Sequence, residues 1–247
     1  QSLREIVRGI FLVRECTQRS KDLVMSFGER LCCLLICEFL RSFEPACVYV
    51  DARHLVKTDD QFGHAQVDFP STMRNIQNHA HAHAPIRVVT GFIASTSSGD
   101  TTTLGRGGSD YTASIFGAAL GAKEIQIWTD VDGVLTADPR IVSHAKVIPE
   151  LSYEEAMELS HFGAKVIYAP TMQPALEAGV PIRIINTFHP EVPGTLIKAD
   201  ISAVGGPVSG LSALTDVSML RVHGSGMVGV AGTASRLFRA LAQSDVS

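Results

Sequence analysis

The sequence predicts an α/β protein in which helices cover a mainly parallel sheet. An apolar run at 85–94, a helical segment at 110–121 and a second apolar run at 124–129 follow one another at the spacing of a strand–helix–strand unit. A glycine-rich turn at 105–110 precedes the helix, and an acidic, glycine-containing loop at 130–134 follows the second strand. Ligands of parallel sheets collect beyond the carboxyl ends of the strands, so both loops are candidate binding segments.

The composition is that of a globular protein with room for a large core. The chain has 247 residues, a formal net charge of -4 and a pI near 6.1, which gives no overall attraction to nucleic acid or anionic lipid. No apolar run reaches the roughly 18 residues that a membrane helix needs, and no signal-peptide pattern is present. We therefore expect a small-molecule substrate, no nucleic-acid or membrane partner, and a cytoplasmic location.

The cysteines and one histidine run raise the question of metal or disulfide chemistry. The cysteines show no CxxC spacing, so we expect reduced core thiols and not a zinc site or disulfide framework; they are Cys16, Cys32, Cys33, Cys37 and Cys47. Alternating histidines at His79, His81 and His83 would share one face of an extended segment. A metal site there remains an alternative to a solvated loop.

The N-terminal half is predicted to contain helices that cover two buried strands. Apolar residues at three- and four-residue spacing predict an amphipathic helix at 1–17, and a segment that is apolar nearly all round predicts a largely buried helix at 21–42. Short β-branched runs at 46–51 and 85–94 predict the strands. We expect a further helix at 71–78 and polar connections at 52–69 and 95–103.

A glycine and a carboxylate interrupt the apolar surface of the second predicted helix. Gly28 precedes Glu29 there, and a glycine inside a helix costs about 1 kcal/mol relative to alanine. Two interpretations offset that cost. Gly28 could permit a close helix crossing, or it could let a ligand approach while Glu29 is presented to it.

The C-terminal half repeats the alternation of helices and strands. A capping box of Ser152 with Glu155 predicts the start of a helix at 152–162. Beyond it, Lys165 lies between small and apolar residues, so a place in a cleft and an ordinary solvated lysine are both open interpretations. A helix at 170–178, a strand at 181–186 and a closing strand at 194–197 follow; a Gly/Ser/Pro-rich linker candidate at 200–210 then leads to a strand-like segment at 211–222 and a helix at 233–242.

Several of these segments suit the handling of phosphate. Phosphoryl transfer requires mainly positioning and neutralisation of spread negative charge, for which Arg106, Arg140 and Lys165 are suitable cations. Bare glycines let the backbone approach an anion, and Ser109 or Asp110 could cap the following helix. The turn matches neither the Walker pattern nor GxGxxG. The residues alone therefore predict a nucleotide- or phosphate-binding α/β enzyme.

Longer motifs resemble the aspartokinases of the amino-acid kinase family. They are SFGERL at 26–31, GFIAST…TTTLGRGGSDYTA at 91–113, WTDVDGVLTADPR at 128–140, ELSHFGAKVIYAPTMQPA at 158–175 and PGTLI at 193–197. This resemblance implies a three-layer αβα kinase domain with a mainly parallel central sheet at 1–199, followed by a linker at 200–210. The run HGSGMVGVAGTASRLFRAL at 223–241 resembles the start of an α+β ACT regulatory domain, which implies a truncated ACT domain at 211–247.

The resemblance also assigns roles to matching residues. On the substrate side, Glu29 would hold the amino group, Arg106 a carboxylate, and Phe92 would line the pocket; Gly107, Gly108 and Ser109 would complete it. Asp110 would orient the catalytic cations, and Lys165 would reach the phosphates. The nucleotide side would consist of Thr129, Asp130, Asp138, Arg140 and Lys165. Magnesium would be carried by ATP, so we expect no dedicated set of protein ligands.

The implied activity is ATP-dependent phosphorylation of the β-carboxylate of L-aspartate to 4-phospho-L-aspartate. This is the first step of lysine, threonine and methionine biosynthesis. The family pattern further implies a homo-oligomer that an end-product amino acid inhibits through the ACT region. A catalytically silent regulatory or binding subunit and a kinase for another amino acid or for a nucleoside monophosphate are the alternatives.

Two departures from the family pattern modify these expectations. The family's first strand carries a Lys-Phe-Gly-Gly-Thr-Ser type motif, and none of the lysines in this chain has such a context. We therefore expect the N-terminal part of the kinase domain to be missing and the chain to be inactive by itself. Leu135 stands where many relatives have a tyrosine near the adenine, so that contact is not expected here.

Overall fold

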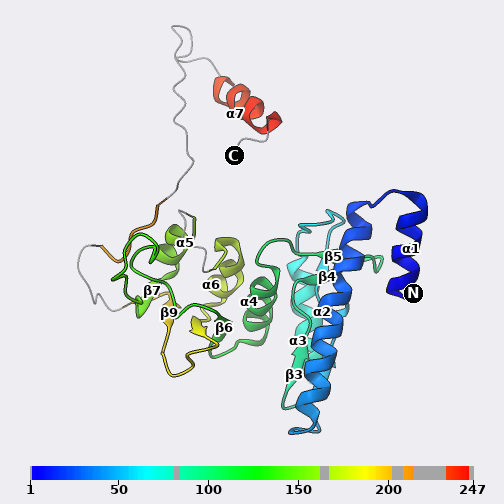
Figure 1. The fold of residues 1–247 in the computed structure, drawn as a ribbon, viewed down its shortest axis with the longest axis horizontal. Helices are drawn as coiled ribbons and strands as arrows, with labels where there is room; N and C mark the ends of the chain where they lie inside the picture. The colour runs from blue at the N-terminus through cyan, green and yellow to red at the C-terminus, as the bar shows by residue number, and fades with distance from the viewer. Residues whose placement is uncertain (1, 81–83, 162–166, 202–207, 214–231, 245–247) are drawn as a thin grey trace. The chain divides into compact units, whose positions relative to one another are not determined.

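The computed structural model describes residues 2–80, 84–161, 167–201, 208–213 and 232–244 (Figure 1). The chain divides into two compact units, residues 1–213 and 214–247. In the second unit the described part is the helix α7 (Thr233–Gln243), which confirms the helix predicted at 233–242. The predicted domain boundaries and the ACT start stay predictions, because residues 214–231 lie outside the described part.

Short strands and helices alternate throughout the first unit (Figure 1). Its first half contains α1 (Leu3–Val13), α2 (Gln18–Arg41), β1 (Val48–Val50), the 3-10 helix η1 (Ala52–His54), β2 (Lys57–Thr58), α3 (Phe69–Ala80), β3 (Arg87–Val89), β4 (Ile93–Thr96) and β5 (Thr101–Thr103). Its second half contains α4 (Gly108–Leu120), β6 (Ile125–Thr129), β7 (Glu150–Ser152), α5 (Tyr153–His161), the 3-10 helix η2 (Ala169–Met172), α6 (Gln173–Ala178), β8 (Ile182–Asn186) and β9 (Thr195–Lys198).

The described strands form three sheets in which parallel pairs predominate. The strand orders are β1-β3, β2-β4-β5 and β6-β8-β9-β7. The pairs β1/β3, β2/β4, β6/β8 and β7/β9 are parallel, whereas β4/β5 and β8/β9 are antiparallel. The predicted α/β class is confirmed. The expected pairing across the strand–helix–strand unit is wrong in detail, because β6 pairs with β8 and the strands before α4 belong to other sheets.

Helix α4 lies between the cores of the two halves. Ile115 and Ala119 belong to the apolar cluster around α3 and β1, while Ala113 packs against the cluster that surrounds β6, β8 and β9. A side chain at Gly117 would collide with Ile125 of β6, so the glycine lets helix and strand approach closely. The glycine-rich turn before α4 therefore sits where the two halves of the unit meet.

The segment 85–94, predicted as one strand, is two strands separated by a backbone turn. β3 ends at Val89 and β4 begins at Ile93, and Phe92 between them has a left-handed φ of 67°. β4 then turns back into β5 as an antiparallel hairpin. The prediction of a polar connection at 95–103 is wrong, since the threonines of β5 are buried strand residues. Most of the irregular segment predicted at 52–69 is confirmed, apart from η1 and β2.

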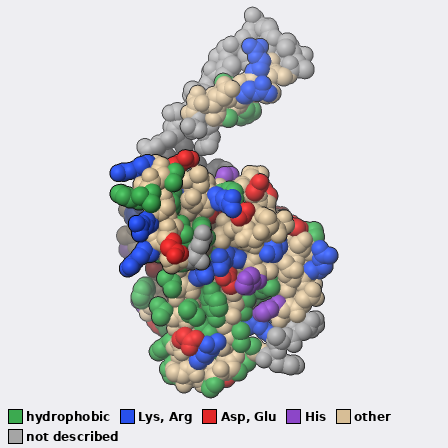
Figure 2. Space-filling model, turned by 90° about the vertical axis from the view of Figure 1, so that its right-hand side faces the viewer, with side chains coloured by type: hydrophobic (Ala, Val, Ile, Leu, Met, Phe, Trp, Pro, Cys, Tyr) green, Lys and Arg blue, Asp and Glu red, His purple; other side chains and the backbone are tan. Residues whose placement is uncertain are grey.

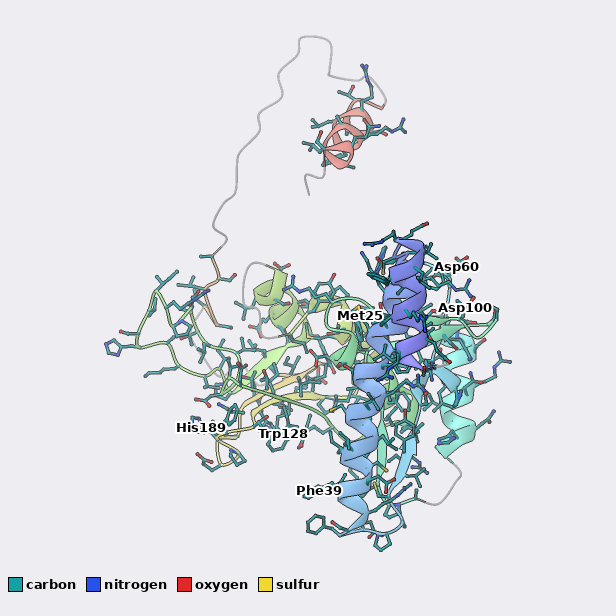
Figure 3. All side chains as sticks on the ribbon, turned by 45° about the vertical axis from the view of Figure 1, so that its right-hand side comes forward. Met25, Phe39, Asp60, Asp100, Trp128 and His189 are labelled. Atoms are coloured by element: carbon teal, nitrogen blue, oxygen red, sulfur yellow. The ribbon has the colours of Figure 1, made fainter. Side chains whose placement is uncertain are left out.

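Helix α2 is far more exposed than its apolar composition predicts. Its buried residues are Asp22, Ser26 and Cys37, whereas Leu35 and Phe39 are 70% and 66% exposed. Met25 and Phe39 are labelled on the same side of the helix (Figure 3). Figure 2, which faces the right-hand side of Figure 1, shows hydrophobic side chains in several surface patches. The prediction of a largely buried helix is therefore wrong.

One buried carboxylate fixes the N-terminal part of α2 to the hairpin. Asp22 is fully buried and accepts hydrogen bonds from the backbone N–H groups of Gly63 (2.8 Å) and Thr103 (3.0 Å) and from the hydroxyl of Thr103 (3.1 Å). A buried carboxylate is stable only when its lone pairs are satisfied in this way. The interaction positions α2, and with it Glu29, relative to β5.

The remaining sequence predictions concern membranes, cysteines and the histidine run. Among the described residues, no helix is long and apolar enough to cross a membrane. All five cysteines are free, but the expectation of core thiols holds only for Cys37 and Cys47, because Cys16 and Cys32 are exposed and Cys33 is half-buried. His81 and His83 lie outside the described residues, so the metal alternative there stays a prediction.

Candidate active site

A cavity of about 390 Å³ opens at the N-terminal end of α4. It is lined by Glu29, Phe92, Gly105, Gly107, Gly108, Ser109 and Asp110. All except Gly105 are residues that the sequence predicts for substrate binding or catalysis. The structure thus brings together side chains from α2, from the turn before β4 and from the glycine-rich loop, which are up to 81 positions apart in the sequence.

The glycines of the loop are required by its backbone and by close packing. Gly105 and Gly107 have left-handed φ values of 72° and 67°, a region that L side chains rarely adopt. A Cβ atom at Gly107 would lie 3.0 Å from side-chain atoms of Tyr168 and Thr171, and one at Gly108 would lie 2.7 Å from the ring of Phe92. Larger residues would therefore push the loop away from two neighbouring segments.

Gly107 is the N-cap residue of α4, and no side chain caps the helix there. The prediction that Ser109 or Asp110 caps the helix is wrong, because both residues lie after the N-cap, within the first turn of α4. Asp110 is still well placed electrostatically, since the partial positive charge of a helix N-terminus favours a carboxylate in the first turn.

Phe92 is held in its left-handed backbone conformation by a hydroxyl of α4. Its N–H donates to Thr112 Oγ1 (3.0 Å), and that hydroxyl in turn donates to the carbonyl of Gly108 (2.8 Å). A non-glycine residue in this region costs on the order of 1–3 kcal/mol, and such strain clusters at functional sites. The sequence analysis missed Thr112, because nothing in its local pattern distinguishes it from an ordinary helical threonine.

Burial destabilises the charged forms of the two carboxyl groups in the cavity, Glu29 and Asp110. Desolvation raises the pKa of Glu29 and of Asp110 above the usual range. Two partly desolvated acids in one cavity favour a ligand that brings positive charge, such as an ammonium group or a cation bound to a phosphate. The electrostatics of this cavity therefore select for a cationic or zwitterionic ligand.

Arg106 lies in the same loop but is not among the residues that line the cavity. Its side chain is exposed, and its guanidinium carbon lies 5.5 Å from the centre of the Tyr168 ring. Stacking on an aromatic ring limits the directions that the guanidinium can take. Tyr168 is a second residue that the sequence analysis missed. Lys165, the predicted catalytic lysine, lies outside the described residues.

The predicted nucleotide residues form two local pairs after β6. Thr129 Oγ1 donates to Asp130 Oδ1 (3.2 Å) at the carboxyl end of the strand. Arg140 Nε and Nη2 bind the carboxylate of Asp138 at 3.0 and 2.6 Å, which lowers the pKa of Asp138 and raises that of Arg140. A short connection joins α4 to β6, so the carboxyl end of β6 returns toward the end of α4 that carries the cavity.

A further carboxylate in the loop after β6 was not predicted. Asp132 binds Asn186, the last residue of β8, and His189, which lies in the connection to β9 (Figure 3). Among the described residues, no group of three or more His, Cys, Asp or Glu side chains is placed to hold a metal ion. A magnesium ion carried by a nucleotide's phosphates does not need such a group.

Comparison with known proteins decides the family. The sequence profile of the amino acid kinase family matches residues 5–186. The chain belongs to the amino acid kinase family. This kinase-family chain is 35% identical over 244 residues to aspartokinase 1, chloroplastic, of Arabidopsis thaliana, covering 96% of the chain and 43% of the relative. It is 41% identical over 183 residues to the bifunctional aspartokinase/homoserine dehydrogenase of Haemophilus influenzae, covering 74% of the chain and 22% of the relative.

Solved structures give the same result for the fold of this kinase-family chain. Aspartokinase III of E. coli in complex with aspartate and ADP superposes with a TM-score of 0.82 at 32% identity, covering 99% of this chain and 56% of that chain. Its complex with lysine and aspartate gives 0.76 at 30% identity, with the same coverage. The resemblance to aspartokinases and the kinase fold are confirmed. The chain spans less than half the length of the first curated relatives that it matches.

Proposed function

We propose that the full protein carrying this chain is an aspartate kinase. The reaction transfers the γ-phosphoryl group of ATP to the β-carboxylate of L-aspartate and yields ADP and 4-phospho-L-aspartate. The observation that carries the proposal is the cavity at the start of α4, where Glu29 and Asp110 are both desolvated beside a glycine-rich loop that presents Arg106. The similarity to aspartokinases over 96% of the chain supports the same substrate.

The charges of L-aspartate are complementary to the side chains of this region. The ammonium group of the substrate would bind Glu29, which returns a positive partner to a desolvated carboxylate. A substrate carboxylate would bind Arg106, whose planar fork suits bidentate contacts. Phe92, Gly107, Gly108 and Ser109 would form the walls that orient the β-carboxylate. Asp110 would orient the cations that neutralise the transferred phosphoryl group.

The nucleotide would lie along the segment that follows β6. Thr129, Asp130 and Asp138 would surround it, Arg140 would bind phosphate oxygens, and Lys165 would reach the transferred group. Magnesium bound to ATP would neutralise charge on the phosphates and leave the residues of this chain to position the two substrates. The ADP bound to the E. coli aspartokinase III structure supports nucleotide use by this fold.

Regulation, assembly and location form the finer part of the proposal. We expect feedback inhibition by an end-product amino acid through the complete ACT region, and the lysine in one E. coli aspartokinase III complex is an example in a relative. We further expect a homo-oligomer in the cytoplasm. Light scattering with and without each end-product amino acid tests the assembly, and cell fractionation tests the location.

A catalytically silent regulatory or binding subunit is the second candidate function. A Lys-Phe-Gly-Gly motif upstream of Gln1 in the full protein would favour the enzyme, and its absence there would favour the silent subunit. The two candidates differ in the full protein, because only the enzyme forms an acyl phosphate. A hydroxamate assay with aspartate, glutamate and other acyl acceptors detects that product. Hydroxamate from aspartate alone supports the proposal, and none from any acceptor supports the silent subunit.

Replacement of Arg106 tests the assignment of the substrate side. We expect Arg106→Ala in the full enzyme to raise the aspartate KM about tenfold to a hundredfold, because a hydrogen bond to a charged group contributes about 1.5–3 kcal/mol. The KM for ATP should change by no more than about twofold. Arg8→Ala, on exposed α1, is the matched control. An equal rise of both KM values would refute the assignment of Arg106 to the substrate carboxylate.

A further inference from the structure

The loop after β6 is joined to the end of β8 through the side chain of Asp132. Asp132 Oδ1 accepts a hydrogen bond from Asn186 Nδ2 at 2.6 Å and is 3.0 Å from His189 Nδ1. Asn186 is the last residue of β8 and only 5% exposed, whereas His189 is exposed in the connection to β9 (Figure 3). The carboxylate of Asp132 thus contacts two residues that lie 54 and 57 positions further along the chain.

The orientation of Asn186 is fixed by its other hydrogen bond. The side-chain oxygen Oδ1 of Asn186 accepts a hydrogen bond from the backbone N–H of Phe188 at 2.8 Å. The side-chain nitrogen Nδ2 must therefore face Asp132. The N–H of Thr187 donates to the carbonyl of Thr129 at 2.8 Å, which continues the pairing of β6 and β8 past their ends. A rigid, buried donor is therefore presented to the loop that begins at Thr129 and Asp130.

The far end of the same loop is fixed by a different contact. The N–H of Val134 donates to the buried hydroxyl of Thr195 at 2.9 Å, and that hydroxyl donates to the carbonyl of Ile148 at 2.7 Å. A Cβ atom at Gly133 would lie 2.5 Å from Thr195 Oγ1, so the backbone is pressed against β9 there. Between these two ends, the Asp132 side chain attaches the loop to Asn186 and His189.

The strength of the Asp132 contact depends on the charge of His189. The hydrogen bond and charge of Asp132 raise the pKa of His189, to which Glu191 adds, and the hydrogen bonds from His189 and Asn186 lower the pKa of Asp132. The ion pair is therefore complete below the ordinary histidine pKa of 6.5 and is lost as the pH rises through the raised value. At the acid end it is lost as the carboxylate of Asp132 protonates, below the ordinary aspartate value of 3.8.

Resting on the proposed kinase function, we propose that Asp132, Asn186 and His189 are positioning residues that hold the loop 129–134 in its nucleotide-binding conformation. The hydrogen bond from Asn186 to Asp132 is present at every pH at which Asp132 is ionised. The ion pair between His189 and Asp132 varies with the protonation of His189. Thr129 and Asp130, at the start of the loop, then meet the nucleotide in a fixed geometry. Nucleotide affinity falls as His189 loses its proton, while aspartate affinity does not.

The test measures ADP binding to the full protein by calorimetry at pH 6.0 and 8.5, which needs no turnover. Because the phosphates of ADP also titrate, the informative quantity is the affinity of each variant relative to wild type at the same pH. His189→Gln should bind ADP about threefold to fivefold more weakly at pH 6.0 and equally at pH 8.5, as an exposed ion pair makes only a small contribution. His144→Gln, an exposed histidine outside this network, is the matched control.

A reciprocal measurement separates positioning from a merely structural role. If protonation of His189 tightens ADP binding, saturation with ADP must raise the pKa of His189 by the same factor, which the NMR titration of its ring protons reports. Asp132→Asn should lower that pKa and remove its response to ADP. An unchanged His189 pKa on ADP saturation, or equal ADP affinity of His189→Gln and wild type at both pH values, overturns the proposal.

The outcomes distinguish this proposal from the proposed function. Aspartyl hydroxamate formation together with a pH-independent ratio of His189→Gln to wild-type affinity overturns only the role of His189. The expected pH linkage in ADP binding without hydroxamate from aspartate overturns only the substrate assignment.

Discussion

The substrate side and the nucleotide side of this site hold their carboxylates in opposite electrostatic states. Burial raises the pKa values of Glu29 and Asp110 at the start of α4. Hydrogen bonds from His189 and Asn186 lower the pKa of Asp132, and those from Arg140 lower the pKa of Asp138. The first region therefore gains from a ligand that supplies positive charge, whereas in the second region part of the charge is already balanced within the protein.

The two regions differ in their backbone as well. The loop before α4 is packed against Phe92, Tyr168 and Thr171, so its shape is set before a ligand arrives. On the nucleotide side, Arg140 is 80% exposed and bound to Asp138. A phosphate that recruits Arg140 must compete with this carboxylate, and so the affinity gained per contact should be smaller there.

The largest expected effect comes from changing the rigid loop itself. Gly107→Ala introduces a Cβ atom at a left-handed φ and 3.0 Å from two side chains, so we expect a loss of about 2–3 kcal/mol in unfolding free energy, measured by urea denaturation. The value of kcat/KM for aspartate should fall at least tenfold, because the cavity changes shape.

Gly99→Ala is the matched control for this substitution. Gly99 also has a left-handed φ, of 90°, but nothing lies within 4 Å of the added Cβ atom. It should therefore show only the backbone cost, about 1–2 kcal/mol, and unchanged kinetics. Equal kinetic loss in both variants would show that backbone strain alone, and not contact with Tyr168 and Thr171, shapes the cavity.

An intermediate effect is expected at the desolvated carboxylate. Glu29→Gln should raise the aspartate KM about tenfold, since it removes the charge that binds the substrate ammonium group, and leave the KM for ATP unchanged. Because the pKa of Glu29 is raised, its ionisation opposes folding once the pH exceeds the ordinary value of 4.5. Thermal denaturation should therefore show Glu29→Gln to be more stable than wild type at pH 8 and equally stable below pH 4.5.

The exposed Glu38 on the same helix provides the comparison, because Glu38→Gln should change neither the KM nor this stability difference. A Glu29→Gln protein that loses stability at pH 8 would contradict the desolvated state inferred for the substrate side.

The smallest effect is expected on the nucleotide side. Arg140→Ala should raise the KM for ATP about threefold to tenfold and leave the KM for aspartate unchanged, since the arginine gives up its contact with Asp138 to bind phosphate. Lys123→Ala, an exposed cation before β6, is the control. A hundredfold effect of Arg140→Ala would show that the ion pair with Asp138 imposes no competition.

The parts of the site that the sequence predicted are those encoded in contiguous motifs. The glycine-rich loop from Gly105 to Asp110 needs its residue types for reasons that are local, namely left-handed φ values and close approach of the backbone. The capping box of Ser152 and Glu155 is confirmed by both of its hydrogen bonds. Glu29 is predicted by its motif and by the unusual glycine beside it, and the structure places it in the same cavity.

The parts that the sequence did not predict depend on contacts between distant segments. Thr112 matters only because Phe92 lies next to it, and Asn186 only because Asp132 faces it. The hairpin of β4 and β5 was missed because threonine-rich segments are also common in loops. Helix α2 was predicted to be buried from its apolar residues, yet composition does not say which faces of a helix find a partner.

The buried carboxylate of Asp22 has a consequence for how the chain folds during synthesis. Its partner Thr103 is 81 residues further along, so at 5–20 residues per second Asp22 is made roughly 4–16 seconds before this contact can form. Throughout that interval Asp22 lacks the backbone and hydroxyl donors of Thr103 that attach α2 to β5. The attachment of α2 to the hairpin should therefore form only after β5 has left the ribosome.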